Sequence, residues 1–424
     1  MDNFINSVRL DKDLCKGCIH CIKRCPTQAI RVRNGKAHII PEFCIDCGEC
    51  IRVCPHHAKK AHYDSLDVIN NYEYTVALPA PSFYAQFNNL EDINIVLRAL
   101  KHMGFDDVFE VSAAAELVSQ LSREYIEKHK DKAPFISSAC PSVVRLIRVR
   151  FPNLIEHILP INAPIDIAAE EAVKKAMKDT GLPREKIGII FISPCPAKVS
   201  AVRHPIVNEK SEIDAVVAIK HVYKKILNFM VETQNDGEDL SQSGKIGISW
   251  GASGGEAGGL LTDSYLAADG IENVIKVLED LEDQKISNLE FIELNACSGG
   301  CVGGVLQVEN PYVAKSKLKH LRKYMPVAKN HIEESNGVEK AFWDKTLEYQ
   351  PVFNLGRDFA DGLAKMEQVE QLVSKLPGLD CGSCGAPTCK ALAEDIVRGI
   401  ANEKDCIHLL REYIHKISSD LNEI

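Results

Sequence analysis

The sequence lacks the features of an exported or membrane-embedded protein. No stretch of its 424 residues approaches the roughly 18 uninterrupted apolar residues of a membrane-spanning helix. The first residues, Met1 to Asp13, have neither the basic start nor the apolar core of a secretory leader, so we expect a cytoplasmic protein without a membrane span. A basic excess is also missing: 50 Lys and Arg stand against 59 Asp and Glu, which makes nucleic acid an unexpected partner.

Cysteine, in contrast, is abundant. The chain has 16 cysteines, and without a leader it is expected in a reducing compartment, where disulfides do not persist. Metal ligation is therefore the expected role of these residues. The length allows about two or three domains, and the cysteines form an early, a central and a late group along it.

The early group consists of two copies of the pattern C-x-x-C-x-x-C-x-x-x-C-P. This spacing is typical of bacterial two-cluster ferredoxins, in which the fourth cysteine of each copy ligates the other cluster. A zinc-binding or disulfide-stapled repeat is the alternative, but all eight cysteines and both prolines fit the iron–sulfur pattern. We expect two [4Fe–4S] clusters, one on Cys15, Cys18, Cys21 and Cys54 and one on Cys44, Cys47, Cys50 and Cys25.

The late group contains four cysteines, enough for one complete site: Cys381, Cys384, Cys389 and Cys406. Zinc is a serious alternative for four thiolates at this spacing. We favour an iron–sulfur cluster, because residues 370–410 resemble the small four-cysteine cluster domain at the ends of several anaerobic electron-transfer proteins.

The central group is scattered, and a single such cysteine would ordinarily be a small buried apolar residue. Each of three short apolar segments, however, runs directly into a loop that contains Cys140, Cys195, or Cys297 with Cys301. Helical patterns over 164–179 and 221–233 lie between them, which predicts β/α alternation with the cysteines at the carboxyl ends of parallel strands, where open sheets bind ligands. A further strand is predicted over 245–249, and Gly251 in the glycine-rich loop after it allows close backbone approach.

Residues 75–310 resemble the catalytic domain of the [FeFe]-hydrogenases. The three loops of that family correspond to Ser137-Ser138-Ala139-Cys140-Pro141, Ser193-Pro194-Cys195-Pro196-Ala197-Lys198 and Cys297-Ser298-Gly299-Gly300-Cys301. The resemblance implies that the four cysteines hold the cube of an H-cluster and that Cys301 bridges to a di-iron unit with CO, cyanide and a bridging dithiolate. It also implies that Pro81, Ser82 and Lys198 contact the cyanides, although Lys198 could instead be a solvated surface lysine.

The departures from the family concern proton transfer. Ala139 stands where the active enzymes have a proton-transferring cysteine, and Leu159 where they have a serine; Gln120-Leu121-Ser122 replaces Met-Glu-Glu. Three further changes alter the surroundings of the di-iron unit: Ser193, Asn295 and Ile165. An alanine methyl cannot carry a proton, so slow turnover is expected. These departures resemble the sensory [FeFe]-hydrogenases.

The predicted fold class is α/β: a hydrogenase-like domain with parallel sheets flanked by helices, a small α+β ferredoxin domain, and a small, mainly helical C-terminal cluster domain. The predicted boundaries are 1–62, 73–365 and 366–424. The predicted function is slow, reversible H2 oxidation and proton reduction in a hydrogen or redox sensor, with a ferredoxin-type electron carrier and a separate signalling protein as partners. The alternatives are a non-catalytic iron–sulfur carrier or scaffold without the di-iron unit, and a fast hydrogenase with a rerouted proton path.

Overall fold

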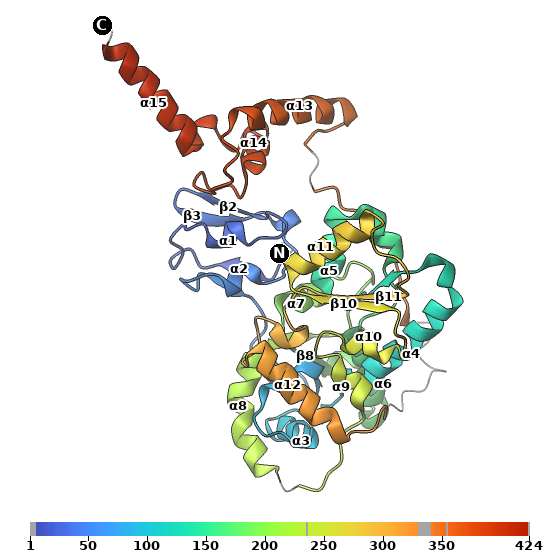
Figure 1. The fold of residues 1–424 in the computed structure, drawn as a ribbon. Coiled ribbons are helices and arrows are strands. Elements are labelled where there is room, and N and C mark those ends of the chain that lie inside the picture. Colours follow the sequence, from blue (N-terminus) through green and yellow to red (C-terminus); the bar gives the residue numbers. More distant parts are fainter. Residues whose placement is uncertain (1–5, 235, 330–340, 353–354, 423–424) are drawn as a thin grey trace. The chain divides into compact units, whose positions relative to one another are not determined.

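The chain divides into two compact units, which are described separately (Figure 1). The computed structural model describes residues 6–234, 236–329, 341–352 and 355–422. The first unit comprises residues 1–7, 45–48 and 62–349, and the second comprises residues 8–44, 49–61 and 350–424. Among the described residues, no helix is long and apolar enough to cross a membrane.

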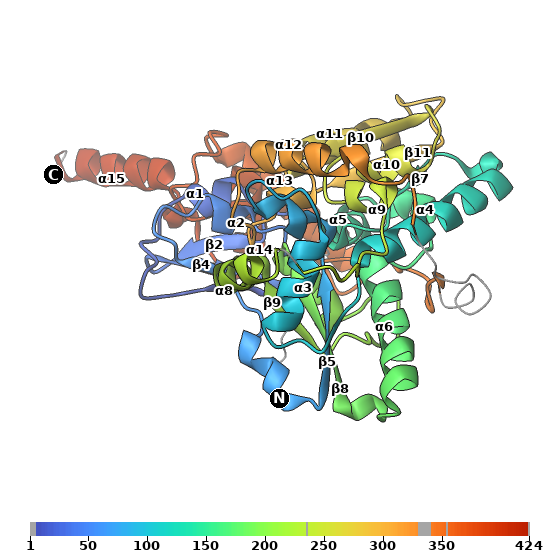
Figure 2. The same ribbon diagram turned by 90° about the horizontal axis from the view of Figure 1, so that it is seen from below.

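The larger sheet of the first unit is entirely parallel. Its strands, in spatial order, are β6 (Asp107–Val108), β5 (Tyr74–Pro79), β8 (Ile187–Ser193) and β9 (Ala215–Ala218). All seven residues of β8 are buried, because its run of apolar residues is covered on both faces, as is usual in parallel sheets. Figure 2 shows α6 (Pro164–Thr180) on one side of this sheet, and α3 (Asn94–His102) and α8 (Ile219–Glu232) on the other.

The smaller sheet is also parallel and has its central strand in β11 (Phe291–Asn295). Its neighbours are β10 (Tyr265–Asp269) and β7 (Phe135–Ile136). Helices α11 (Ile271–Glu282) and α10 (Gly255–Gly259) lie on opposite sides of it in Figure 1. The other α-helices of this unit are α4 (Val111–Lys128), α5 (Pro141–Arg150), α7 (Pro196–Arg203), α9 (Lys245–Ser249) and α12 (Pro311–Leu321).

The short helices of the first unit lie mostly in the connections between these elements. They are 3-10 helices: η2 (Leu66–Asn71), η3 (Pro81–Gln86), η4 (Lys130–Lys132), η5 (Pro152–His157), η6 (Arg184–Lys186), η7 (Cys301–Gly303) and η8 (Arg322–Tyr324). The predicted helices over 164–179 and 221–233 are confirmed as α6 and α8. The three apolar segments that precede the central cysteines are confirmed as strands.

The predicted strand over 245–249 is wrong, because these residues form helix α9. Its first amides are satisfied from outside the helix: a buried oxygen of Glu116 accepts hydrogen bonds from Gly244 N (2.5 Å) and Gly247 N (3.4 Å). A carboxylate at a helix N-terminus stabilises the exposed amides and opposes the helix dipole. A distant residue therefore decides the local structure.

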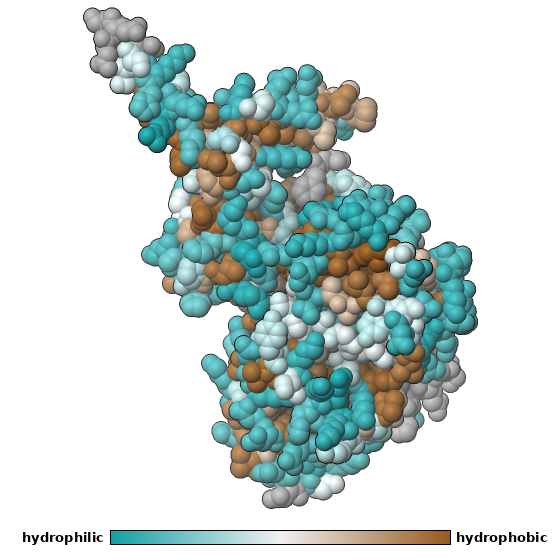
Figure 3. Space-filling view, viewed as in Figure 1, coloured by the Kyte–Doolittle hydropathy of each residue, from teal (hydrophilic) through white to brown (hydrophobic). Residues whose placement is uncertain are grey.

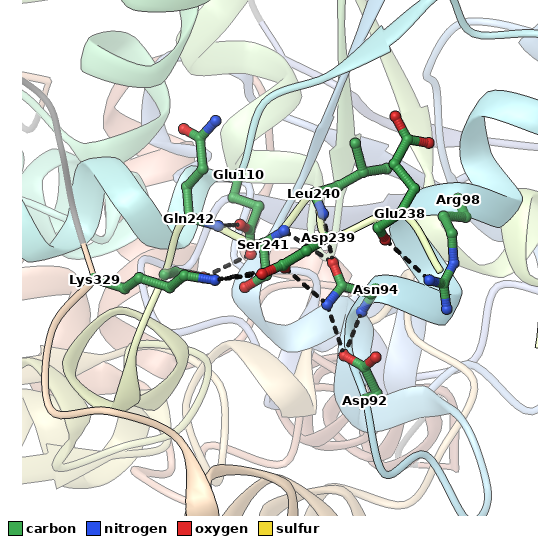
Figure 4. A network of polar contacts seen from close by, with 11 residues as sticks. Asp92, Asn94, Arg98, Glu110, Glu238, Asp239, Leu240, Ser241, Gln242 and Lys329 are labelled. Carbon is green, nitrogen blue, oxygen red and sulfur yellow. Dashed lines mark hydrogen bonds and ion pairs between the residues drawn. The ribbon is translucent and has the colours of Figure 1, made fainter. Parts of the chain in front are cut away.

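The segment that leads into α9 is fixed by polar contacts to two other helices (Figure 4). Asn94 Oδ1 accepts hydrogen bonds from the amides of Leu240 (2.8 Å) and Ser241 (2.9 Å). Arg98 donates to Glu238 O (2.9 Å), and Glu110 accepts from Gln242 N (2.5 Å). These bonds attach residues 238–242 to α3 and to the start of α4, and so help to position α9.

The second unit combines residues from both ends of the chain. Its N-terminal part has two antiparallel strand pairs, β1 (Val8–Leu10) with β4 (Lys59–Ala61) and β2 (Ile30–Arg33) with β3 (Lys36–Ile39). The helices of this part are α1 (His20–Lys23), η1 (Pro41–Phe43) and α2 (Glu49–Arg52). Its C-terminal part is helical, with α13 (Phe359–Lys375), α14 (Cys389–Val397), η11 (Glu403–Asp405) and α15 (Ile407–Asn422).

The fold class is thus the predicted one, α/β with parallel sheets and a small helical C-terminal region. Hydrophilic side chains cover most of the surface that Figure 3 displays, interrupted by apolar patches. Helix α13 carries exposed apolar side chains at Phe359, Leu363 and Met366. The apolar core of the first unit is extensive and includes both faces of β5 and β8.

Candidate metal centres

The central cysteines lie where strands of two different sheets end. Cys140 follows β7 and caps the N-terminus of α5, and Cys195 follows β8 and caps α7. Cys297 follows β11, and Cys301 begins η7. The partial positive charge at a helix N-terminus favours a thiolate over a thiol, which suits Cys140 and Cys195 as metal ligands.

Lys198 lies close enough to all four cysteines to interact with their charges. Its side chain is buried, with Nζ 3.9 Å from Cys301 Sγ and donating to Ala139 O at 3.4 Å. Burial lowers the pKa of Lys198, but nearby thiolates raise it more, so that its pKa lies above the usual range; they belong to Cys301, Cys195, Cys140 and Cys297. A solvated surface lysine, the alternative interpretation, is therefore excluded.

The thiols respond to the same surroundings. Burial raises the pKa of Cys195 to about 11, while the Lys198 ammonium acts in the opposite direction. Burial also raises the pKa of Cys301. Such thiols need a positive partner before they ionise, and either a bound metal or the lysine supplies it. The set of four partly buried sulfur donors around one cation fits an iron–sulfur cube, whose thiolate ligands give it a net negative charge.

A cavity adjoins this site and is lined by most of the other predicted residues. Pro81, Ser82, Ala139 and Lys198 all border it, together with Cys140 and Cys301. Ser82 is fully buried, and its Oγ accepts a hydrogen bond from Gln307 Nε2 (2.7 Å), which also donates to Cys301 O (3.0 Å).

Gly251 packs against the backbone of Pro81 and Ser82. A Cβ at Gly251 would lie 3.0 Å from Ser82 N and 3.1 Å from Pro81 C, so the two loops are in close contact. Gly251 O also accepts a hydrogen bond from Val302 N at 2.9 Å. A side chain at position 251 would therefore push against the loops that border the cavity.

Two buried acids were missed in the sequence. Glu256 and Glu293 line the same cavity. Ser137 Oγ donates to Glu256 Oε2 (2.6 Å), and Ser137 also accepts from Ala139 N (3.2 Å). Burial and the neighbouring Glu293 raise the pKa of Glu256 to about 8, although the Ser137 hydrogen bond lowers it. For Glu293 the sequence did contain a signal, because a charged residue inside the otherwise apolar strand Phe291–Asn295 is unusual.

The substituted positions are apolar or locally satisfied. Leu159 is buried in an apolar cluster with Ile126 and Phe135. Asn295 donates to Glu293 Oε1 (2.7 Å), and Ser193 Oγ donates to Cys195 O (3.0 Å). The structure thus brings an acid–serine pair, Glu256 and Ser137, next to position 139.

The first ferredoxin-type set is partly gathered in the second unit. Burial and three nearby thiolates raise the pKa of Cys21 to about 11, although Lys59 lowers it; the thiolates are those of Cys18, Cys15 and Cys54. These are the three partners that the spacing predicts for Cys21. The second set, Cys25, Cys44, Cys47 and Cys50, stays a prediction.

The late cysteines form a less protected group. Cys406 is buried in an apolar cluster with partly buried Cys384 and Cys389. Cys381 is exposed, and hydrogen bonds from Ser383 lower its pKa. Within the described ranges, no three His, Cys, Asp or Glu side chains form a compact group for a single metal ion.

Comparisons with known proteins place this α/β iron–sulfur fold in a family. Residues 73–265 and 256–305 match the family "Iron only hydrogenase large subunit, C-terminal domain". The match spans more than half of the chain, so the chain belongs to this family. Residues 7–55 match a 4Fe-4S dicluster domain, and residues 376–408 match an Fe–S cluster domain. The chain is thus a hydrogenase-like iron–sulfur protein.

Curated relatives are distant. "NADP-reducing hydrogenase subunit HndD" of Solidesulfovibrio fructosivorans is 25% identical over 49% of this chain and 44% of its own length. "Iron hydrogenase 1" of Clostridium pasteurianum is 21% identical over 58% and 52%. The chain thus spans about half the length of these two relatives. "Periplasmic [Fe] hydrogenase large subunit" of Nitratidesulfovibrio vulgaris is 24% identical over 74% of this chain and 89% of the relative.

Solved structures of [FeFe]-hydrogenases are also similar. HydA(deltaEFG) is 13% identical, with a TM-score of 0.49 over 68% of this chain and 97% of that chain. A variant of HydA1 from Chlamydomonas reinhardtii is 14% identical, with a TM-score of 0.49 over 66% and 95%.

Proposed function

We propose that this protein oxidises H2 reversibly and slowly at an H-cluster and that it serves as a hydrogen or redox sensor. The observation that carries the proposal is the cavity beside Cys301. It keeps the buried Lys198 and Ser82, which suit anionic diatomic ligands, but has an apolar Ala139 in the place of a proton-transferring thiol. In a pocket without the di-iron unit, Ser82 and Lys198 would have no cyanide ligands to contact.

The chain's own residues account for how the cofactor would be held. Cys140, Cys195, Cys297 and Cys301 supply the thiolates of a cube, with Cys301 bordering the cavity. Lys198 offsets their negative charge, and Gln307 fixes Ser82 against the loop of Cys301. When bound, the di-iron unit supplies the metal chemistry that splits H2 into protons and electrons.

Proton movement would use Glu256. Its carboxylate lies in the cavity wall, accepts the Ser137 hydroxyl hydrogen bond and has a pKa raised to about 8. Such a group can accept a proton near neutral pH. Leu159 is buried in an apolar cluster and offers no polar side-chain atom, so we expect proton transfer to be confined to this one acid and to limit the rate.

Electron movement would use the ferredoxin-type sites. Residues 45–48, which include Cys47, belong to the first unit, where Asp46 accepts from Ser200 Oγ (2.6 Å) and pairs with Arg145 (3.3 Å). A Cβ at Gly48 would lie 2.8 Å from Val305 and 3.6 Å from Pro196, the neighbour of Cys195. This packing brings the backbone next to Cys47 close to the loop of Cys195, a route by which electrons would reach the central site.

A protein that exchanges electrons and reports H2 needs external partners. A small electron carrier such as ferredoxin would exchange electrons with the protein, and a separate signalling protein would receive the output. Sixteen cysteines that serve as cluster ligands suit a reducing, cytoplasmic setting.

Infrared spectroscopy and metal analysis test the proposal. The anaerobically matured protein should show bands of iron-bound CO and cyanide, and four cubes with a di-iron unit imply about 18 iron atoms per chain. No more than about 12 irons, or stoichiometric zinc, would contradict the four-cube assignment.

The alternative is a cluster-bearing carrier or scaffold without the di-iron unit. One relative, "Cytosolic Fe-S cluster assembly factor NAR1 homolog" of Schizosaccharomyces japonicus, is 27% identical over 26% of this chain and 22% of its own length. Cluster iron without CO and cyanide bands, after maturation with the di-iron machinery, would favour this alternative.

A further inference from the structure

The C-terminal cysteine loop is bonded to the ferredoxin-type part of the second unit. Lys23, the last residue of α1, donates through Nζ to Asp380 O (2.6 Å) and Pro387 O (3.2 Å), on both sides of the loop. A Cβ at Gly382 would lie 3.4 Å from Ile22 Cδ1, so this backbone packs against α1. Ile22 directly follows Cys21, and Gly382 directly follows Cys381. The contact therefore brings the predicted ferredoxin-type site of Cys21 close to the predicted C-terminal site of Cys381.

A second group of bonds attaches the loop to β2. Val32 N donates to Gly385 O at 2.8 Å, and Arg33 donates through Nη1 to Cys384 O at 3.0 Å. A Cβ at Gly385 would lie only 1.9 Å from Val32 O. Gly385 also has φ +80°, so both its conformation and its position require glycine.

A buried carboxylate completes the contact. Asp395 of α14 is 1% exposed and accepts from Arg31 Nε (2.6 Å) and Arg33 Nη2 (2.8 Å). Removal of one member of a buried ion pair is costly, because the remaining charge loses its partner. The two ion pairs of Asp395 therefore favour one orientation of the C-terminal domain on the ferredoxin-type part.

We infer that the C-terminal four-cysteine site exchanges electrons directly with the ferredoxin site of Cys15, Cys18, Cys21 and Cys54, and that Lys23 and Arg33 set its reduction potential. The inference rests on the iron–sulfur loading proposed above, but it does not require H2 reactivity. One electron leaves one cluster and enters the other. No bond is broken and no proton is needed.

The packing and the charges both support this role. Electron tunnelling is fastest through closely packed atoms, and the backbone at Gly382, next to Cys381, packs against the side chain of Ile22, next to Cys21. A cluster gains negative charge when it is reduced, so nearby cations stabilise its reduced form and raise its reduction potential. Lys23 and Arg33 are such cations, and both contact the ligand loop.

The test is a redox titration of the full-length protein with dithionite, followed by electron paramagnetic resonance. The signal of the C-terminal cluster is the one that disappears in the Cys381→Ser, Cys384→Ser variant. We expect it to show magnetic coupling to a ferredoxin-type cluster. We also expect Lys23→Met to shift its reduction potential to a lower value, while the control Lys60→Met, which removes an exposed cation paired with Asp11, leaves it in place.

Asp395→Asn tests the docking itself. Loss of the buried charge should weaken the magnetic coupling, whereas Glu394→Gln, the same change at the neighbouring position of α14, should preserve it. Lys23 is exposed, so its variant remains informative if Asp395→Asn fails to fold. Absence of coupling in the wild-type protein, an equal effect of Lys23→Met and Lys60→Met, or zinc at the C-terminal site would each overturn the inference. Because dithionite supplies the electrons, a protein inactive toward H2 still gives a clear result.

Discussion

The central and C-terminal cysteine sites differ in two respects, a buried cation that only the central site is shown to have and an exposed cysteine at the C-terminal site. In the central site, burial raises the thiol pKa of Cys195 and Cys301, and the buried Lys198 supplies the compensating charge. In the C-terminal site, Cys381 is exposed and its pKa is lowered by hydrogen bonds from Ser383. A closed site protects reactive ligands from water, whereas an open one can exchange electrons. We therefore expect the central site to carry out the reaction with H2 and the C-terminal site to exchange electrons.

The largest expected effect separates the two sites. Cys301→Ser should abolish the infrared bands of CO and cyanide, because it removes the predicted bridge to the di-iron unit. The matched Cys381→Ser, Cys384→Ser variant should lose one reducible cluster and keep those bands. Loss of the bands in both proteins would show that the two sites are not separable.

A smaller effect is expected at Glu256. If it accepts the proton released from H2, Glu256→Gln should lower the rate of H2 oxidation by about 10²- to 10⁴-fold. The wild-type rate should rise with pH as the carboxyl, with its pKa raised to about 8, ionises. Its titration is also influenced by Glu293, Ser137 and Lys198, which face it. The variant should lose the rise with pH, and the exposed-surface control Glu282→Gln should keep it.

The gain from restoring a thiol should be modest. Ala139→Cys should speed H2 turnover by about 10²-fold or less, because a thiol with a pKa near the reference of about 8.5 transfers protons only as fast as the next group in the path. A larger gain is expected when Leu159→Ser is added. Measured H2 oxidation by the single and double variants decides between the outcomes. A gain of about 10⁴-fold from Ala139→Cys alone would refute the interpretation that Leu159 also interrupts proton transfer.

Spacing made the ferredoxin-type cysteines recognisable as candidate ligands, because their pattern occurs twice at fixed intervals, and their metal ligation stays a prediction. The strand ends before Cys140, Cys195 and Cys297 were predictable for a similar reason, since buried strands are continuous apolar runs. Helix α9 was not, because its capping partner Glu116 lies far away in the sequence. Glu256 and the Asp395 pair were also missed: a single acid in a sequence does not indicate which distant side chains will bury it.

The last predicted effect concerns stability rather than turnover. The buried carboxyl of Glu256 has a folded pKa raised to about 8 from an ordinary 4.5, so between these values the folded protein binds a proton that the unfolded chain has lost. Stability should therefore fall as pH rises through this window, by up to roughly 1.4 kcal/mol per pH unit from this group. Glu256→Gln cannot ionise, so its thermal midpoint should decline less between about pH 6 and pH 8, while Glu282→Gln should follow the wild type. Parallel declines in all three proteins would mean that Glu256 titrates like an exposed carboxyl, and the proton path proposed through it would lose its support.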